Sequence, residues 1–287
     1  MARIVIIHGI GQQMEGENTL RAGLFPALRD GMSRGGVDVS PEDVSFASYG
    51  EVFRPASEFL APTAYYDEFD VESGYEEQLL IALWRRAAES DETILPPDEE
   101  VLLSAPSIVR RALAAISKSP FLANVAERSF IGDLKQVRMY FCNSDLRAKV
   151  QDRVATAITK DTRVIVAHSL GSVVAYEVLC SRPYWPVRAL VTLGSPLGVR
   201  NLIFDRLQPR PTTDVATGQL IGLWPPVSMW TNIADETDIV AAVEDLRPLF
   251  GNKLRQIRVH NAPKVHDMRS YLTDSLTGYS ISAGLNG

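Results

Sequence analysis

The sequence holds few of the residues from which disulfide-rich and metal-binding proteins are built. Its 287 residues include only two cysteines, Cys142 and Cys180, and four histidines. Two cysteines are too few for a disulfide framework, and their spacing does not fit a zinc site. We therefore expect no bound metal and a reducing, cytoplasmic environment.

Positive charge and long apolar runs are scarce as well. Lys and Arg number 29 against 35 Asp and Glu, for a net charge of −6. Nucleic-acid binding without sequence preference needs a basic surface, so we expect no nucleic-acid partner. No apolar run is long enough to cross a bilayer, and Ile4–Ile7 is too short for the apolar region of a signal peptide. Any membrane contact is expected to be transient and confined to the surface.

Short apolar segments alternate with segments of helical periodicity through much of the chain. The predicted strands are Ile4–Ile7, Val44–Ala47, Val164–Ala167, Ala189–Leu193, Val227–Ile233 and Leu254–Val259. Several are apolar throughout, which is typical of strands buried on both faces of a parallel sheet. The alternation predicts an α/β fold, a single domain over residues 1–287 with a mostly parallel central sheet flanked by helices.

Residues 51–131 depart from this alternation because they contain no convincing strand. The stretch is too long for a plain loop, and apolar stripes of helical spacing occur at 79–88 and 108–116. We interpret it as a helical insertion that lies over the sheet like a lid. Its apolar stripes fit two interpretations, a wall for an acyl chain or a small helical core with no substrate role.

A serine stands where a buried strand runs into a helix. Ser169 has a small residue two positions away on each side, Ala167 and Gly171. A tight strand-to-helix turn strains its central residue, requires small neighbours and presents the hydroxyl at the carboxyl edge of the sheet. A plain strand–helix junction can carry the same five residues, but the strand before and the helix after favour a nucleophile elbow. The N–H of Leu170 is then expected to face a negatively charged oxygen formed at this site.

The first strand ends in a glycine-containing turn, His8-Gly9-Ile10-Gly11. Acyl transfer needs a second N–H donor toward the developing negative charge, and a loop after another central strand commonly supplies it. The two glycines permit the backbone path that would aim the Ile10 amide inward. The alternative, half of a dinucleotide-binding motif, lacks the third glycine. No Gly-Lys-Ser/Thr phosphate loop occurs elsewhere, so we expect no cofactor.

Together, three motifs resemble the α/β-hydrolase superfamily. They are HGIG at 8–11, HSLGS at 168–172 and TLGSPL at 192–197. Within that superfamily they are most similar to lipase and esterase families related to the PGAP-type and class 3 lipases. The resemblance covers residues 1–50 and 132–287 and implies the α/β-hydrolase fold with a catalytic triad. The chain departs from the usual pattern at Ala167, where glycine is common, and it opens on the oxyanion-loop strand without the usual antiparallel strands before it.

In this fold the triad follows the chain order Ser, acid, His. Two histidines, His260 and His266, lie far enough along the chain to be the base. His260 ends the last predicted strand. His266 lies in the loop after it, ahead of a helix expected over Met268–Leu276, where a triad histidine normally occurs, so we prefer His266 to His260. Two aspartates, Asp235 and Asp238, follow the preceding strand. Similar families carry the acid as the first residue of Asp-Pro-Val-Ala, and residues 238–241 (DIVA) align with it, so the resemblance implies Asp238.

These residues predict a serine hydrolase that cleaves a carboxylic ester, either a small molecule or a lipid, through an acyl-enzyme on Ser169. An acyltransferase would use the same acyl-enzyme with an acceptor other than water. A third possibility, from a different functional class, is a binding or signalling protein on a hydrolase scaffold that has lost its catalytic residues. Degradation usually removes the nucleophile, the base or an oxyanion glycine, and the sequence retains all three.

Overall fold

A six-stranded parallel sheet forms the centre of the computed structural model, which describes residues 2–54, 66–97, 105–121 and 127–286. The strand order is β2-β1-β3-β4-β7-β8, and every pairing in this sheet is parallel. Its strands are β1 (Ile4–Ile7), β2 (Val44–Ala47), β3 (Val164–His168), β4 (Ala189–Leu193), β7 (Met229–Asp235) and β8 (Arg255–Val259). The predicted α/β class with a parallel central sheet is confirmed.

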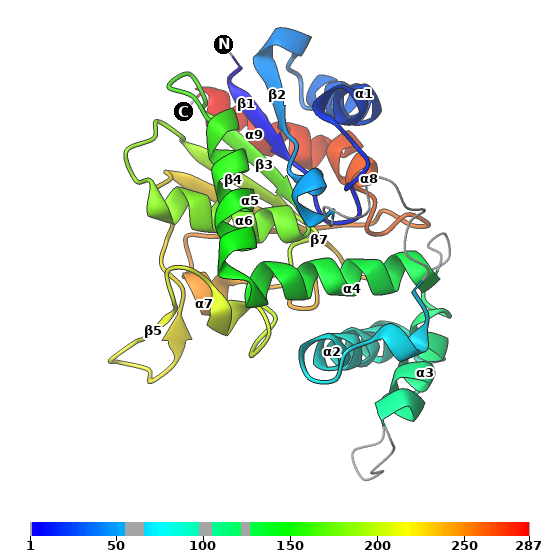
Figure 1. The fold of residues 1–287 in the computed structure, drawn as a ribbon. Coiled ribbons are helices and arrows are strands. Elements are labelled where there is room, and N and C mark those ends of the chain that lie inside the picture. Colours follow the sequence, from blue (N-terminus) through cyan, green and yellow to red (C-terminus); the bar gives the residue numbers. More distant parts are fainter. Residues whose placement is uncertain (1, 55–65, 98–104, 122–126, 287) are drawn as a thin grey trace.

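Helices cover both faces of this sheet (Figure 1). The helices of the described residues are α1 (Glu17–Arg34), α2 (Tyr75–Ser90), α3 (Ala105–Ile116), α4 (Glu127–Cys142), α5 (Ser144–Ala157), α6 (Leu170–Ser181), α7 (Arg247–Phe250), α8 (Met268–Thr273) and α9 (Ser275–Asn286). Helix α7 was not predicted from the sequence, and neither was a short antiparallel pair, β5 (Thr212–Thr213) and β6 (Leu220–Ile221). Two-residue strands carry too little periodicity to be recognised.

Alternate residues of the strands face two separate cores. Ile4 and Ile6 of β1 pack in the core that contains α1, α8 and α9. Val5 and Ile7 face the larger core, which contains α2 to α6. All four side chains are buried, which explains why β1 is apolar at every position instead of alternating. Each such side chain contributes about 1.5–3 kcal/mol to folding.

Two predicted segments differ from the structure by two or more residues at an end, and both lie close to the candidate site. The strand expected at Val227–Ile233 runs instead over Met229–Asp235, so Asp235 is its last residue instead of part of the following loop. The helix expected over Met268–Leu276 ends at Thr273, and a new helix begins at Ser275. The intervening Asp274 has extended backbone angles, and its side chain accepts a hydrogen bond from the Leu276 N–H at the start of α9.

Helix α6 is buried on every side. Residues 170–179 are all buried, because α5 packs against the helix on the side away from the sheet. The closest approach occurs at Gly171, where an added Cβ would lie 2.2 Å from the carbonyl oxygen of His8. Only glycine allows the first turn of α6 to come this close to the end of β1.

The described parts of residues 51–131 contain helices and no strand. Helix α2 packs against α3 and α4, and Figure 1 shows α2 and α3 beyond α4, on the side away from the sheet. Residues 55–65, 98–104 and 122–126 of the predicted insertion lie outside the described residues. Across the described ranges, no helix combines the length and hydropathy needed to span a membrane.

Gly171 provides a test of the contact between α6 and β1. We expect Gly171→Ala to lower the free energy of unfolding by at least about 2 kcal/mol, because its methyl group must displace backbone. The matched control is Gly23→Ala in α1, where an added Cβ meets no atom within 4 Å. This change should stabilise the protein by about 0.5–1 kcal/mol through helix propensity. Urea unfolding of both variants measures the difference, and equal stabilities would contradict the packing described.

Candidate active site

A cavity of about 490 Å³ lies at the carboxyl edge of the sheet. This volume is within the range of small-molecule sites. Its walls come from the ends of β1 and β3, from α1, α2, α4 and the start of α8, from the segments after β4 and β7, and from the loop between β8 and α8. Apolar side chains form most of the inner wall, among them Leu79, Leu83, Phe130, Leu134, Val137, Val199 and Ile203.

Ser169 joins the end of β3 to the start of α6 and lines this cavity. Its backbone angles are φ 53° and ψ −131°, and Asn201 is the only other described non-glycine residue with positive φ. Such backbone costs about 1–3 kcal/mol and is concentrated at functional sites. The Ser169 N–H donates to the Leu193 carbonyl over 3.0 Å, which ties the strained residue to β4.

His266 and Asp238 are brought together from separate loops. The His266 Nδ1 lies 2.7 Å from the Asp238 Oδ2, and His266 lines the same cavity as Ser169. Asp238 is fully buried and accepts two further hydrogen bonds, from the Tyr271 hydroxyl at 2.8 Å and the Val240 N–H at 3.0 Å. Three donors fix the carboxylate, so the imidazole is held with Nδ1 protonated and Nε2 free to accept a proton.

The other aspartate and the other histidine considered for the triad, Asp235 and His260, lie in different surroundings. The Asp235 carboxylate accepts hydrogen bonds from the N–H and hydroxyl of Thr237 and from the N–H of Asn261. It therefore stabilises the turn after β7 and the chain after β8. His260 is exposed and is not part of the cavity wall.

The two predicted oxyanion residues, Ile10 and Leu170, also line the cavity. An added Cβ at Gly9 would lie 3.3 Å from the Ser169 Oγ, so the loop after β1 passes directly beside the nucleophile position. Helix α4 holds this loop, because the Gln136 side chain accepts a hydrogen bond from the Gly11 N–H at 3.2 Å and donates one to Gln13 at 3.2 Å. Within the described residues, the Ser169 hydroxyl has no hydrogen-bond partner, His266 included.

Two other histidines next to Ser169 are held neutral. The imidazole of His8 stacks on the ring of Tyr49 at 4.2 Å; its Nε2 accepts from the Tyr49 N–H, and its Nδ1 donates to the Gly9 carbonyl. Burial lowers the pKa of His8 to about 4. His168 lies 4.6 Å from the ring of His266, and burial, together with the charge of His266 when protonated, holds the pKa of His168 well below its usual value. The candidate base, His266, thus has the uncharged imidazole of His168 beside it.

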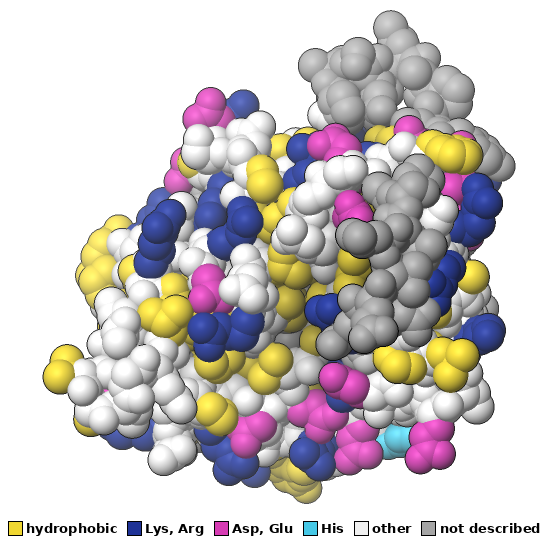
Figure 2. Space-filling model, turned by 90° about the horizontal axis from the view of Figure 1, so that it is seen from below, with side chains coloured by type: hydrophobic (Ala, Val, Ile, Leu, Met, Phe, Trp, Pro, Cys, Tyr) yellow, Lys and Arg dark blue, Asp and Glu magenta, His cyan; other side chains and the backbone are white. Residues whose placement is uncertain are grey.

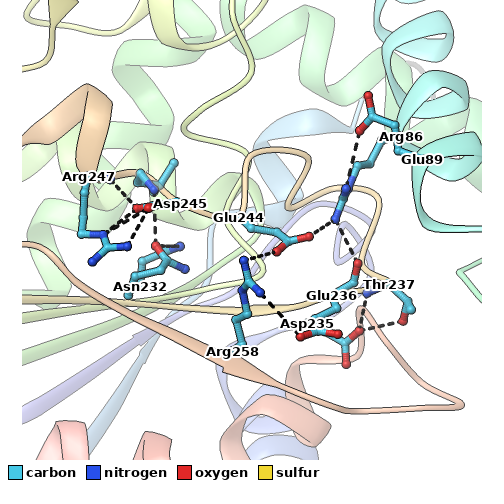
Figure 3. Close-up of polar contacts among 12 residues, drawn as sticks. Arg86, Glu89, Asn232, Asp235, Glu236, Thr237, Glu244, Asp245, Arg247 and Arg258 are labelled. Carbon is cyan, nitrogen blue, oxygen red and sulfur yellow. Dashed lines mark hydrogen bonds and ion pairs between the residues drawn. The ribbon is translucent and has the colours of Figure 1, made fainter.

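The loop that carries the acid is tied to helix α2. Arg86 of α2 pairs with Glu244 and donates to the Glu236 carbonyl at 2.9 Å. Glu244 also pairs with Arg258 of β8 at 3.1 Å, and Figure 3 shows these side chains converging on the segment after β7. Glu236 and Glu244 thus bond to arginines, and neither lines the cavity.

Four residues of the site were not identified from the sequence: Tyr271, Gln136, His168 as a neighbour of the base, and Asp133 on the cavity wall. Three of them occur on helices with no motif around them. Their roles depend on which helices cover the carboxyl edge, and periodicity alone does not determine this. His168 is part of the elbow sequence, but its contact with His266 is made only in the folded chain.

Among the described residues, no three His, Cys, Asp or Glu side chains are grouped so that they could hold a metal ion.

The environment of His8 predicts an unusual titration. The folded chain keeps His8 neutral down to about pH 4, whereas the unfolded chain protonates it near pH 6.5. Between these pH values the unfolded state binds more protons, so the contribution of His8 lowers the free energy of unfolding as the pH falls from 6.5 to 4. Histidine NMR of the wild type should show one imidazole signal that moves only near pH 4 and is missing in His8→Gln. A His8 signal with a midpoint near 6.5 would contradict the buried, stacked environment.

Comparison with known proteins identifies no family for this chain. Neither a protein-family model nor a curated protein matches the sequence. The inference of function therefore depends on the geometry of the cavity and its residues.

Proposed function

We propose that the protein is a serine hydrolase of the α/β-hydrolase fold that cleaves a carboxylic ester through an acyl-enzyme. The observation that carries this proposal is the His266–Asp238 hydrogen bond of 2.7 Å at the wall of the cavity that Ser169 also lines. A buried acid that orients an imidazole beside a strained serine is the arrangement that activates a hydroxyl nucleophile.

The topology supports the choice of fold. Ser169 follows β3, Asp238 follows β7 and His266 follows β8. This is the chain order of the α/β-hydrolase triad, and in a parallel sheet the three strands deliver these residues to one edge. Gly171 allows α6 to pack tightly against β1, which fits the small residue required after the nucleophile of the elbow.

The reaction follows from the roles of these groups. The Ser169 Oγ attacks the ester carbonyl carbon while its proton passes to the His266 Nε2, and Asp238 stabilises the imidazolium that forms. The carbonyl oxygen, now negative, accepts hydrogen bonds from the Ile10 and Leu170 amides. His266 then gives the proton to the departing alcohol oxygen. Water attacks the acyl-enzyme, loses a proton to His266 and releases the carboxylic acid, and Ser169 regains its proton.

The Ser169 hydroxyl has no hydrogen-bond partner among the described residues. This agrees with the mechanism, because hydrogen bonds among catalytic groups often shorten only when substrate is bound.

The apolar inner wall, formed largely by α2 and α4, suits the acyl part of the ester. The cavity reaches the surface between α1 and α8, where its lining includes the exposed residues Thr19 and Arg269. Figure 2 shows the face on the side of α2 and α3, where charged side chains of both signs are interspersed with hydrophobic ones.

Replacement of the nucleophile tests the proposal directly. We expect Ser169→Ala to lower the rate of hydrolysis of p-nitrophenyl butyrate by about four to six orders of magnitude. The melting temperature should change little, because the Ser169 hydroxyl makes no hydrogen bond in the described structure. Ser195→Ala is the matched control, since Ser195 is also buried at the carboxyl edge but its hydroxyl accepts from the Leu197 N–H. An active, folded Ser169→Ala protein would refute the mechanism.

Substitution of Asp235, the last residue of β7, and of Asp238, in the loop after it, should separate an effect on stability from an effect on turnover. Asp238→Asn is expected to lower kcat by about ten-thousand-fold, because the amide cannot hold the imidazole in the required tautomer. Asp235→Asn should lower the free energy of unfolding by about 1–3 kcal/mol through weakened turn hydrogen bonds, with kcat within about tenfold of wild type. Steady-state kinetics and urea unfolding on both variants measure these effects. An inactive Asp235→Asn beside an active Asp238→Asn would reverse the assignment.

A further inference from the structure

Asp133 of α4 is a carboxyl group on the cavity wall that the proposed mechanism does not use. It lines the cavity together with Ser169 and His266. Its Oδ1 lies 3.1 Å from the position of an added Cβ at Gly11, directly beyond the oxyanion loop. The residue is half-buried, so its remaining exposure is toward the cavity.

Asp133 has no hydrogen-bond or ion-pair partner among the described residues. The basic residues that follow it on α4 are engaged elsewhere, Lys135 with Glu76 and Arg138 with Glu72 and Glu76. Burial raises the pKa of Asp133 to about 7, and the charge of His266 acts in the opposite direction. A buried carboxyl without a partner costs stability. A ligand that supplies the missing partner would recover this cost.

The charges around the cavity favour a positively charged partner. Its lining contains the carboxylates Glu15, Asp133 and Asp267, and only one cationic side chain, Arg269, among the described residues. Arg269 lies 3.9 Å from Asp267 and is thereby partly neutralised. The lining histidines other than His266 have lowered pKa values and carry no charge at neutral pH. The cavity is therefore negative overall and would repel an anionic group.

Aromatic rings lie on the same wall as Asp133. Phe130 precedes Asp133 by three residues, on the same face of α4. Its ring meets that of Phe121 edge to face at 5.9 Å, and Phe121 in turn lies 5.5 Å from the His266 ring. A carboxylate beside aromatic rings is the combination that binds an alkylated ammonium group, by charge and by cation–π attraction.

We propose that the cavity selects esters whose alcohol part carries an ammonium group, and that Asp133 binds this group. The alcohol side is indicated because His266 must protonate the departing alcohol oxygen. The Phe121 ring, which contacts His266, also contacts Phe130, one helical turn before Asp133. The proposal rests on the proposed ester hydrolysis and specifies its substrate class. The acyl part then occupies the rest of the apolar wall, at Leu79 and Leu83 of α2.

A pair of substrates of nearly equal shape tests this selectivity. Butyrylcholine carries a quaternary ammonium group, and 3,3-dimethylbutyl butyrate carries carbon in place of the nitrogen. We expect wild type to show a kcat/KM about tenfold or more higher for the charged ester. Asp133→Asn, which is equal in size, should bring this ratio near one and leave kcat/KM for the neutral ester within about threefold of wild type. Glu15→Gln is the matched control, because it removes another lining carboxylate and should preserve most of the preference.

The possible failures are distinguishable. Hydrolysis of both esters that depends on Ser169 but shows no preference, or a preference that survives in Asp133→Asn, would overturn the ammonium site and leave the hydrolase function standing. Absence of hydrolysis of both esters would overturn the proposed function. A measurement of choline binding would then test the role of Asp133. Calorimetric titration of the Ser169→Ala protein with choline should show binding that is lost in Ser169→Ala/Asp133→Asn. No binding, or equal binding by both proteins, would refute the site.

Discussion

The parallel hydrogen bonding of the central sheet determines where chemistry can occur in this molecule. Because β1, β3, β7 and β8 run in the same direction, the loops that leave them all emerge at one edge. Segments far apart in the sequence therefore meet there: the glycine loop after β1, Ser169 after β3, Asp238 after β7 and His266 after β8. The close contact of Gly171 with the His8 carbonyl completes this arrangement, because it sets the start of α6 directly against the loop after β1.

The helices between β2 and β3 are bonded to both sides of this edge. Gln136 of α4 holds the loop that carries Ile10, and Arg86 of α2 holds the loop that carries Asp238. Any opening of the cavity by movement of α2 and α4 together must break both sets of hydrogen bonds. In the described structure these helices act as a wall that positions the two loops, a role additional to the covering role predicted from the sequence.

Much of the fold could be predicted from the sequence because it is encoded locally. An apolar run such as Ile4–Ile7 and a serine between small residues are visible within a few positions, and the parallel sheet follows from the alternation of strands and helices. The prediction for Asp238 over Asp235 depended on a four-residue resemblance, and the structure places Asp238, and not Asp235, beside His266. Tyr271, Gln136 and Arg86 gave no signal, because each acts through a contact between elements distant in the chain. The end of β7 was misplaced by two residues because Ala234 and Asp235 continue the strand beyond its apolar run.

Two carboxyl groups near His266 show how burial and partners assign different roles to the same chemistry. Asp238 is fully buried and accepts three hydrogen bonds, so contacts within the protein fix its position. Asp133 reaches the same cavity without a donor among the described residues, and burial raises its pKa to about 7. A desolvated carboxyl without a partner destabilises the fold. In the proposed ammonium site, a cation that enters the cavity would supply this partner, so a group that weakens the free protein would strengthen the binding of a charged substrate.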